Sequence, residues 1–122
     1  MSHFVKEATE NTPKIDINTN QGTFLLKGVS YPENAIKFYE EIQELVKSYA
    51  SDAPDTTKVH LELYYFNTST TREILKLLLQ LKEASSTIEI DWYYKENSAI
   101  VLEKGRDFSE LVGLDFNYIK TS

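Results

Sequence analysis

The stretch V-H-L-E-L-Y-Y-F-N-T-S-T-T-R-E-I-L-K-L-L-L-Q-L, residues 59–81, decides the fold because its hydrophobic period changes in the middle. Apolar and polar residues alternate over residues 59–65, a pattern typical of a β-strand with one buried face. Apolar residues then recur at helical spacing over residues 70–84. The two patterns meet at a polar corner, residues 67–71, so we predict a strand that turns directly into a helix.

The apolar residues of this second segment cover an unusually wide part of the expected helix. Their arc is roughly 200°, whereas a surface helix needs a stripe of about 100°. Either the helix is sandwiched between other elements, or its extra apolar surface is kept for a partner. The sequence leaves both interpretations open for Ile74, Leu75, Leu77, Leu78, Leu79 and Leu81.

The rest of the chain contains further strand and helix patterns. Residues 15–17 and 23–28 alternate like strands around the turn sequence N-T-N-Q-G, which predicts a β-hairpin. The capping box S-Y-P-E precedes an amphipathic helix over residues 32–49. Later patterns predict a strand at 88–94, a mostly helical segment at 95–113 interrupted near Gly105, and an edge strand at 116–119.

A β-hairpin followed by three helix–strand units predicts an α/β fold with a mixed sheet. Strands separated by helices pair in parallel through right-handed crossovers, and the hairpin adds an antiparallel part. Acidic residues at alternate positions of the strands at 59–65 and 88–94 indicate that helices leave one sheet face partly uncovered. We expect residues 1–12 to form a loose N-terminal tail and residues 13–122 to form a single domain.

The composition argues against several classes of function. The 122 residues carry a net charge of −6 with a pI near 4.9, which disfavours binding to nucleic acid. Because the chain has no cysteine, it has no disulfide, no thiolate nucleophile and no cysteine metal site. Without an apolar run of membrane-spanning length or the apolar core of a signal peptide, we expect a cytoplasmic protein with no membrane insertion.

The titratable side chains do not form a catalytic or metal-binding pattern. His3 lies in the expected tail and His60 on a strand, so a metal pair or a histidine relay is unsupported. Glu40, Glu41 and Glu44 fall on the outer side of the 32–49 helix, where a solvated face is expected. We therefore expect no enzymatic activity, no cofactor and no metal.

Aromatic residues end two of the expected neighbouring strands, as Y-Y-F at 64–66 and W-Y-Y at 92–94. In a parallel sheet both clusters stand near the carboxyl edge, where α/β proteins usually place their sites. Plain packing and a surface for a partner or ligand both remain possible from the sequence.

The polar corner holds more hydroxyl and amide side chains than one helix cap needs. Any of Asn67, Thr68, Ser69, Thr70 and Thr71 is a candidate N-cap, and T-x-x-E at 70–73 has the form of a second capping box. A phosphate on one of these hydroxyls would meet free N–H groups and the positive end of the helix dipole. The residues alone favour the simple cap and leave the phosphate as an alternative.

Three sequence blocks resemble the SiaC family of small bacterial regulatory phosphoproteins. They are S-Y-P-E-N-A at 30–35, Y-F-N-T-S at 65–69 and F-S-E-L-V-G-L-D-F-N at 108–117, and the likeness runs over residues 12–119. The resemblance implies a fold like the anti-sigma-factor-antagonist (STAS) domain. It also implies that a Ser/Thr kinase and a PP2C-type phosphatase switch the protein, and that the unphosphorylated form binds and activates a diguanylate cyclase that makes cyclic di-GMP.

The family's phosphoacceptor is the threonine of F-N-T-S, which the resemblance assigns to Thr68. We therefore expect Thr68 at the centre of a partner-binding surface formed by residues 67–71 and the following helix, with Asn67 and Thr70 as helix caps. Two alternatives remain at this point: a STAS-like module that binds a small ligand, and a constitutive scaffold that uses the leucine-rich helix.

Overall fold

The structure is a computed structural model that describes residues 3–121. The described strands are β1 (His3–Lys6), β2 (Lys14–Asn18), β3 (Thr23–Ser30), β4 (Thr56–Phe66), β5 (Thr87–Lys95) and β6 (Phe116–Thr121). The described helices are α1 (Ala35–Ala50), α2 (Thr68–Ala84) and α3 (Ala99–Val112). The expected order of a hairpin followed by three helix–strand units is confirmed.

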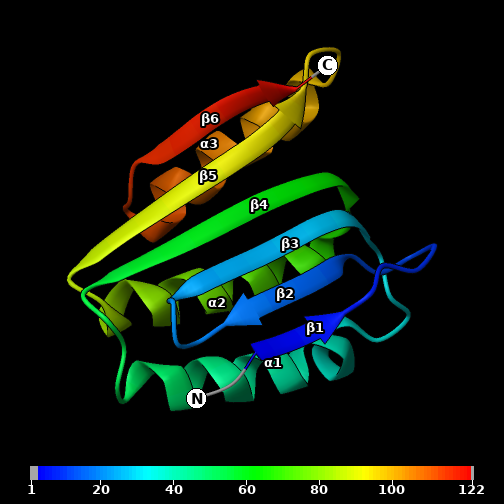
Figure 1. Cartoon of the computed structure of the whole chain (residues 1–122). Coiled ribbons are helices and arrows are strands. Elements are labelled where there is room, and N and C mark those ends of the chain that lie inside the picture. Colours follow the sequence, from blue (N-terminus) through cyan, green and yellow to red (C-terminus); the bar gives the residue numbers. More distant parts are fainter. Residues whose placement is uncertain (1–2, 122) are drawn as a thin grey trace.

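The six strands form one mixed sheet in which the spatial order follows the chain order, β1 to β6. β1, β2 and β3 pair antiparallel, whereas β3 to β6 pair in parallel. Right-handed crossovers that always advance in the same direction place all connecting helices on one face. Figure 1 shows α1, α2 and α3 together behind the sheet, and the opposite face has no helix within the described residues.

The N-terminal segment is not the loose tail that the sequence suggested. Residues 3–6 form β1, whose Phe4 lies opposite Ile17 of β2, and His3 Nε2 lies 2.7 Å from Asp16 Oδ1. A strand of four residues has too few positions to show an alternating hydrophobic pattern in the sequence. It forms because it pairs with β2, which a local pattern does not reveal. Residues 1 and 2 of the expected tail lie outside the described residues.

The wide apolar arc of α2 is explained by its position as the middle helix. Ile74, Leu77, Leu78 and Leu81 are buried in the core, and α2 contacts both α1 and α3 (Figure 1). Three neighbours, the sheet and two helices, therefore cover the arc, and the sandwiched interpretation is confirmed. Leu79 is the exception, because it remains 43% exposed.

Helix α1 begins later than the sequence indicated and uses a different cap. Its N-cap is Asn34, whose Oδ1 accepts from the backbone N–H of Lys37 at 3.1 Å. Ser30, the expected capping serine, is instead the last residue of β3 and is fully buried. The S-Y-P-E sequence thus imitates a capping box, while the serine side chain points into the core.

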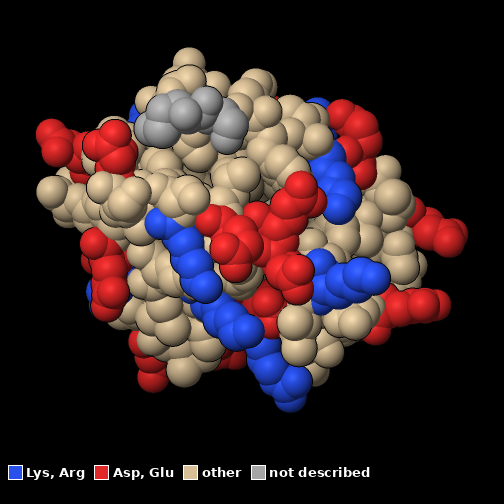
Figure 2. Space-filling view, turned by 90° about the horizontal axis from the view of Figure 1, so that it is seen from below, with Lys and Arg blue, Asp and Glu red and all other residues tan. Residues whose placement is uncertain are grey.

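The outer surface of α1 is the solvated face that its sequence predicts. Glu40, Glu41 and Glu44 are exposed, and Glu44 lies 3.8 Å from Lys47. Figure 2, which views the molecule from below relative to Figure 1, shows acidic and basic side chains next to one another on this side. Such exposed pairs contribute little to stability.

Helix α3 continues through Gly105, where an interruption was expected. A Cβ at this position would lie 2.5 Å from Nε1 of Trp92, a side chain that is only 1% exposed. The same Nε1 donates to the carbonyl of Val101 in α3 at 2.9 Å. The glycine therefore allows the indole ring to approach the helix backbone, and the helix ends at Gly113 in the left-handed conformation.

Replacement of Gly105 by alanine tests this close approach. Alanine improves helix propensity by about 1 kcal/mol, but overpacking against a buried indole costs about 1–3 kcal/mol. Because the added Cβ would lie 2.5 Å from the indole, we expect the upper part of this cost, about 2–3 kcal/mol, so Gly105→Ala should lower the free energy of unfolding by about 1–2 kcal/mol and change the fluorescence of Trp92. Glu110→Ala, on the exposed side of the same helix, should stay within about 0.5 kcal/mol of the wild type. A variant as stable as the wild type would contradict the packing argument.

The uncovered face of the sheet carries a polar network on β4. Glu62 accepts from the hydroxyl of Tyr64 at 2.6 Å, and its other oxygen lies 2.9 Å from Nε2 of His60. Burial raises the pKa of Glu62, but these hydrogen bonds and the charge of Lys27 outweigh it, so the net pKa lies below its ordinary value. The hydrogen bond to Glu62, with some burial, raises the pKa of Tyr64 to about 12.

We expect Tyr64→Phe to lower the free energy of unfolding by about 0.5–1 kcal/mol at pH 7, because Glu62 loses one donor at a partly solvated site. The lowered pKa of Glu62 means that its stabilising contribution is present above the unfolded pKa and is lost as the pH falls through the folded pKa. The difference between variant and wild type in urea unfolding should therefore shrink as the pH falls from 5 to below about 4.3, the ordinary pKa of glutamate. Tyr93→Phe, which keeps its ring stacked on His60 at 4.0 Å, is the matched control and should show neither effect.

Candidate functional site

The polar corner predicted from the sequence connects β4 directly to α2. β4 ends at Phe66, and Asn67 has an extended backbone and caps α2, with its Oδ1 accepting from the N–H of Thr70 at 3.0 Å. The role of Asn67 as a cap is confirmed. Thr68 is the first residue of α2 and is exposed. Because Asn67 already supplies the cap, the hydroxyl of Thr68 is not needed for that role.

Thr70 is neither a cap nor a surface residue, which corrects the sequence interpretation. It is fully buried, and its hydroxyl donates to the carbonyl of Ser30 at 3.0 Å. Two residues along an α-helix correspond to a rotation of about 200°. Thr70 therefore points into the core when Thr68 points to solvent.

Thr70 belongs to a buried cluster of three hydroxyl groups. The hydroxyl of Ser30 lies 2.9 Å from that of Thr70 and 2.7 Å from that of Tyr39 in α1. Burial raises the pKa of Tyr39 to about 12, so the phenol stays protonated and can take part in this network. The cluster ties the end of β3, the second turn of α1 and the first turn of α2 together beneath the corner.

The other two hydroxyls of the corner differ in exposure. Ser69 is exposed, whereas Thr71 is half-buried and donates its hydroxyl to the carbonyl of Asn67 at 3.1 Å. Of the expected surface residues, the structure thus brings Asn67, Thr68, Ser69 and Thr71 to the surface or its margin and removes Thr70 from it.

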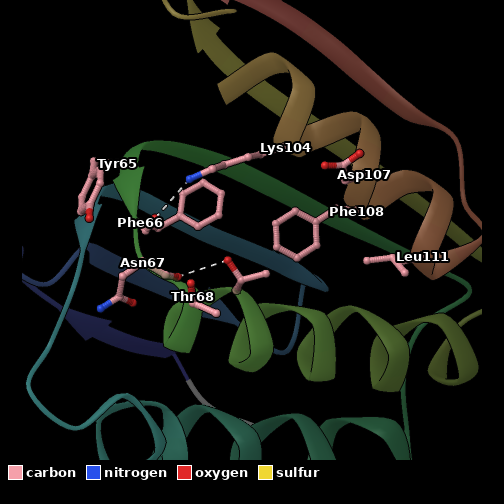
Figure 3. A pocket seen from close by; sticks show the side chains of 9 residues that line it. Tyr65, Phe66, Asn67, Thr68, Lys104, Asp107, Phe108 and Leu111 are labelled. Atoms are coloured by element: carbon pink, nitrogen blue, oxygen red, sulfur yellow. Dashed lines mark hydrogen bonds between the residues drawn. The ribbon is translucent and has the colours of Figure 1, made fainter. Parts of the chain in front are cut away.

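A pocket of about 390 Å³ lies beside Thr68, between the end of β4, the first turn of α2 and α3 (Figure 3). The buried rings of Phe66 and Phe108 form apolar surface in it, and the exposed side chains of Tyr65 and Leu111 lie at its rim. The lining residues are Tyr65, Phe66, Asn67, Thr68, Thr71, Lys104, Asp107, Phe108 and Leu111.

The charged side chains of the pocket are Lys104 and Asp107, both from α3. Lys104 Nζ lies 4.6 Å above the ring of Phe66 and 3.4 Å from its carbonyl oxygen (Figure 3). This arrangement is suited to binding apolar and hydrogen-bonding groups. Within residues 3–121, no three His, Cys, Asp or Glu side chains are grouped so that they could hold a metal ion.

The residues of the two aromatic clusters divide between core packing and surface, because Phe66 and Trp92 are buried whereas Tyr65 is exposed. Trp92 is buried and packs against Phe66, Phe108 and Phe116, so in W-Y-Y the packing interpretation holds for the tryptophan. Tyr65 is 54% exposed, beside the pocket, with its ring centroid 5.7 Å from that of Tyr31.

Sequence reasoning missed the contribution of α3 to this site. Ile100, Lys104, Asp107 and Leu111 follow the spacing i, i+4, i+7, i+11 and so lie on one face of the helix. Ile100 and Leu111 are both more than 60% exposed, although both are large and apolar. This spacing of exposed apolar and charged residues was the sequence pattern that could have indicated a contribution of α3 to the site.

These features define a small mixed α/β protein with an exposed threonine and an apolar pocket at a strand-to-helix corner. No helix within the described residues is long and apolar enough to cross a membrane. The chain matches the SiaC family of regulatory phosphoproteins over residues 6–121 and therefore belongs to this family. The resemblance seen in the sequence is confirmed.

Solved structures of the family have the same fold. SiaC of Pseudomonas aeruginosa superposes with a TM-score of 0.85 at 25% identity, over 99% of this chain and 100% of that one. SiaC in the crystal structure of the diguanylate cyclase SiaD in complex with its activator SiaC, from the same organism, gives a TM-score of 0.89 at 25% identity, over 97% and 99%. An uncharacterized protein of P. aeruginosa (strain UCBPP-PA14) is 27% identical over 113 residues, 90% of each chain.

The buried hydroxyl cluster yields a stability prediction for the corner. Thr70→Val keeps the volume but removes the donor to the Ser30 carbonyl and the partner of the Ser30 hydroxyl. We expect it to lower the free energy of unfolding by about 1–3 kcal/mol in urea titrations. Ser69→Ala, one residue away on the exposed side, should change it by less than about 0.5 kcal/mol. Equal stability of the two variants would show that the cluster does not hold the corner.

Proposed function

We propose that this chain is a non-enzymatic regulatory protein whose unphosphorylated form binds and activates a diguanylate cyclase, and that phosphorylation of Thr68 releases the cyclase. The observation that carries the proposal is the exposed hydroxyl of Thr68 beside an apolar pocket, at a corner where Asn67 already supplies the cap. Support comes from membership of the SiaC family and from the fold shared with the SiaC that activates the cyclase SiaD.

The partner surface consists of the corner and the pocket beside it. Asn67, Thr68, Ser69 and Thr71 provide hydrogen-bonding groups, and the exposed side chains at the pocket rim provide apolar contact area. Thr70 supports this surface from below through the buried hydroxyl cluster. In the unmodified protein the acceptor side chain is neutral, so a partner can cover it at little electrostatic cost.

The proposed switch is a reversible phosphoryl transfer. A Ser/Thr kinase forms a bond between Thr68 Oγ1 and the terminal phosphorus of a nucleoside triphosphate. The phosphoanhydride bond breaks, a base of the kinase takes the hydroxyl proton, and the nucleoside diphosphate leaves. A PP2C-type phosphatase restores the hydroxyl by transferring the phosphoryl group to water. The cytoplasm is the expected compartment, because it supplies the nucleoside triphosphates.

Phosphorylation adds a charge of about −1.5 to −2 to the surface. An unpaired charge that a partner must bury costs on the order of 2–4 kcal/mol, or about 30- to 1,000-fold in affinity. The positive end of the α2 dipole stabilises the negative phosphate at the first turn, so we expect the fold to tolerate phosphothreonine 68. The effect of phosphorylation is therefore expected at the interface, with little change in the fold.

Thr68→Ala is expected to abolish phosphorylation while cyclase binding and activation remain constitutive. The experiment combines the purified chain, its kinase, ATP and the cyclase, and measures incorporated phosphate by intact mass and cyclic di-GMP production by chromatography. Ser86→Ala, which removes an exposed hydroxyl outside the partner surface, is the control and should be phosphorylated and released like the wild type. Full phosphorylation of the Thr68→Ala variant would show that the acceptor is a different residue.

A second candidate function is a module that binds a small ligand in the same pocket. Its volume of about 390 Å³ falls within the range of about 300–1,000 Å³ found for ligand sites, and its rings would contact an apolar or planar molecule. Native mass spectrometry of the protein from its own cells would show a retained ligand under this alternative and an added 80 Da, the mass of one phosphoryl group, under the phosphoprotein proposal. The scaffold alternative loses its motivation, because α1, α3 and the sheet bury most of the leucine face of α2.

A further inference from the structure

Lys104 is the only cationic side chain among the described residues that line the Thr68 pocket. It forms no salt bridge within residues 3–121, whereas several other surface cations do; Arg72, one helical turn after Thr68, also forms none there but does not line the pocket. Arg106 lies 2.8 Å from Glu103, and Lys76 lies 3.3 Å from Glu73. The ammonium of Lys104 instead rests on the ring and the carbonyl of Phe66, the residue two positions before Thr68. A half-buried cation without an anionic partner thus lies in the same pocket as the proposed acceptor.

We propose that Lys104 is the internal counter-ion of phosphothreonine 68, so that the phosphorylated side chain folds into the protein's own pocket and closes it. This inference rests on the proposed function, because it assumes that Thr68 is the acceptor. It adds a second effect of phosphorylation. The phosphate does more than repel the partner, since its ion pair with Lys104 also occupies the site to which the partner binds.

The present contacts of Lys104 are weak enough to be exchanged for a phosphate. Its distance of 3.4 Å to the Phe66 carbonyl is beyond the usual range for an N–H···O hydrogen bond. A lysine side chain is also flexible and carries three rotatable donors, so the ammonium can turn toward Thr68 while its stem keeps its packing. A phosphate oxygen offers a charge-assisted bond, which is about twice as strong as a neutral one.

The other groups that face the pocket determine where the phosphate lies. Asp107 is the second charged side chain of the pocket and repels the phosphate. It is one helical turn beyond Lys104 toward Leu111, away from the corner (Figure 3). The first turn of α2 carries the positive end of its dipole. The phosphate is therefore held between Lys104 and the start of α2, at the Asn67 end of the pocket.

The test uses protein with phosphothreonine incorporated at position 68 during translation, so that it does not depend on the kinase. ³¹P NMR follows the second ionisation of the phosphate from pH 4 to pH 9. A nearby cation stabilises the dianion and lowers this pKa. We expect the titration midpoint of Lys104→Met to lie about 0.5 pH unit above that of the wild type. This is the shift that the Coulomb attraction between the ammonium and the added phosphate charge produces in water at a separation of about 5 Å.

Three further variants make the result specific. Lys104→Gln should raise the midpoint as Lys104→Met does, and it guards against a packing defect caused by methionine. Lys104→Arg keeps the charge and should restore a midpoint near that of the wild type. Arg106→Gln removes one positive charge from the exposed side of the same helix and should leave the midpoint unchanged. The same midpoint in all five proteins would overturn the assignment of Lys104.

The outcomes also separate this inference from the proposed function. If the kinase does not modify Thr68, the proposed function fails, whereas the titration still decides whether Lys104 contacts a phosphate there. If phosphorylation of Thr68 releases the protein from the cyclase as proposed, but the Lys104 substitutions do not change the titration midpoint, the proposed function stands and the counter-ion role is wrong.

Discussion

The three helices of residues 3–121 share one face of the sheet because the crossovers from β3 to β6 advance in a single direction, one strand at a time. This constraint determines most of the architecture. It makes α2 the middle helix, so the sheet, α1 and α3 bury its wide apolar arc. It also places the groove between α2 and α3 at the carboxyl end of β4, where the chain turns at Asn67. The pocket beside Thr68 is therefore a consequence of how the chain winds, and the opposite sheet face stays open and polar.

The corner is held from below by hydroxyl groups that come from three separate elements. The carbonyl of Ser30 accepts from the backbone N–H of Asn67 at 3.2 Å and from the hydroxyl of Thr70 at 3.0 Å, and the Ser30 hydroxyl bonds to Tyr39. Buried polar groups that are fully paired favour one arrangement over alternatives. The support explains how a charge can be added at Thr68 while the change remains at the surface. The proposed switch and the proposed Lys104 ion pair both depend on this separation between a fixed base and a modifiable surface.

Long periodic segments were predictable, and short or non-local features were not. The strand at 59–65 and the following helix stood out because each repeats its pattern several times. Both sequences of capping-box form misled us for the same reason: Ser30 and Thr70 turn inward and bond to each other at 2.9 Å, although 40 residues separate them. Gly105 was interpreted as a break because its partner, the ring of Trp92, lies on a different element. Local patterns carry no information about which distant group a side chain will meet.

The candidate site shows the same division. The surplus of hydroxyls at 67–71 was visible in the sequence, and the resemblance to the SiaC family assigned Thr68 among them, but the contribution of Lys104, Asp107 and Leu111 required the packing of α3 against α2. The sequence alone determined the type and order of the long elements, because periodicity is a local property. The pairing of β1 and the strand order that puts the connecting helices on one face were decided by the tertiary structure. Only the tertiary structure decided which hydroxyl is free. Thr68 and Thr70 are chemically identical and two residues apart, yet a rotation of about 200° along α2 puts one in solvent and the other in the core.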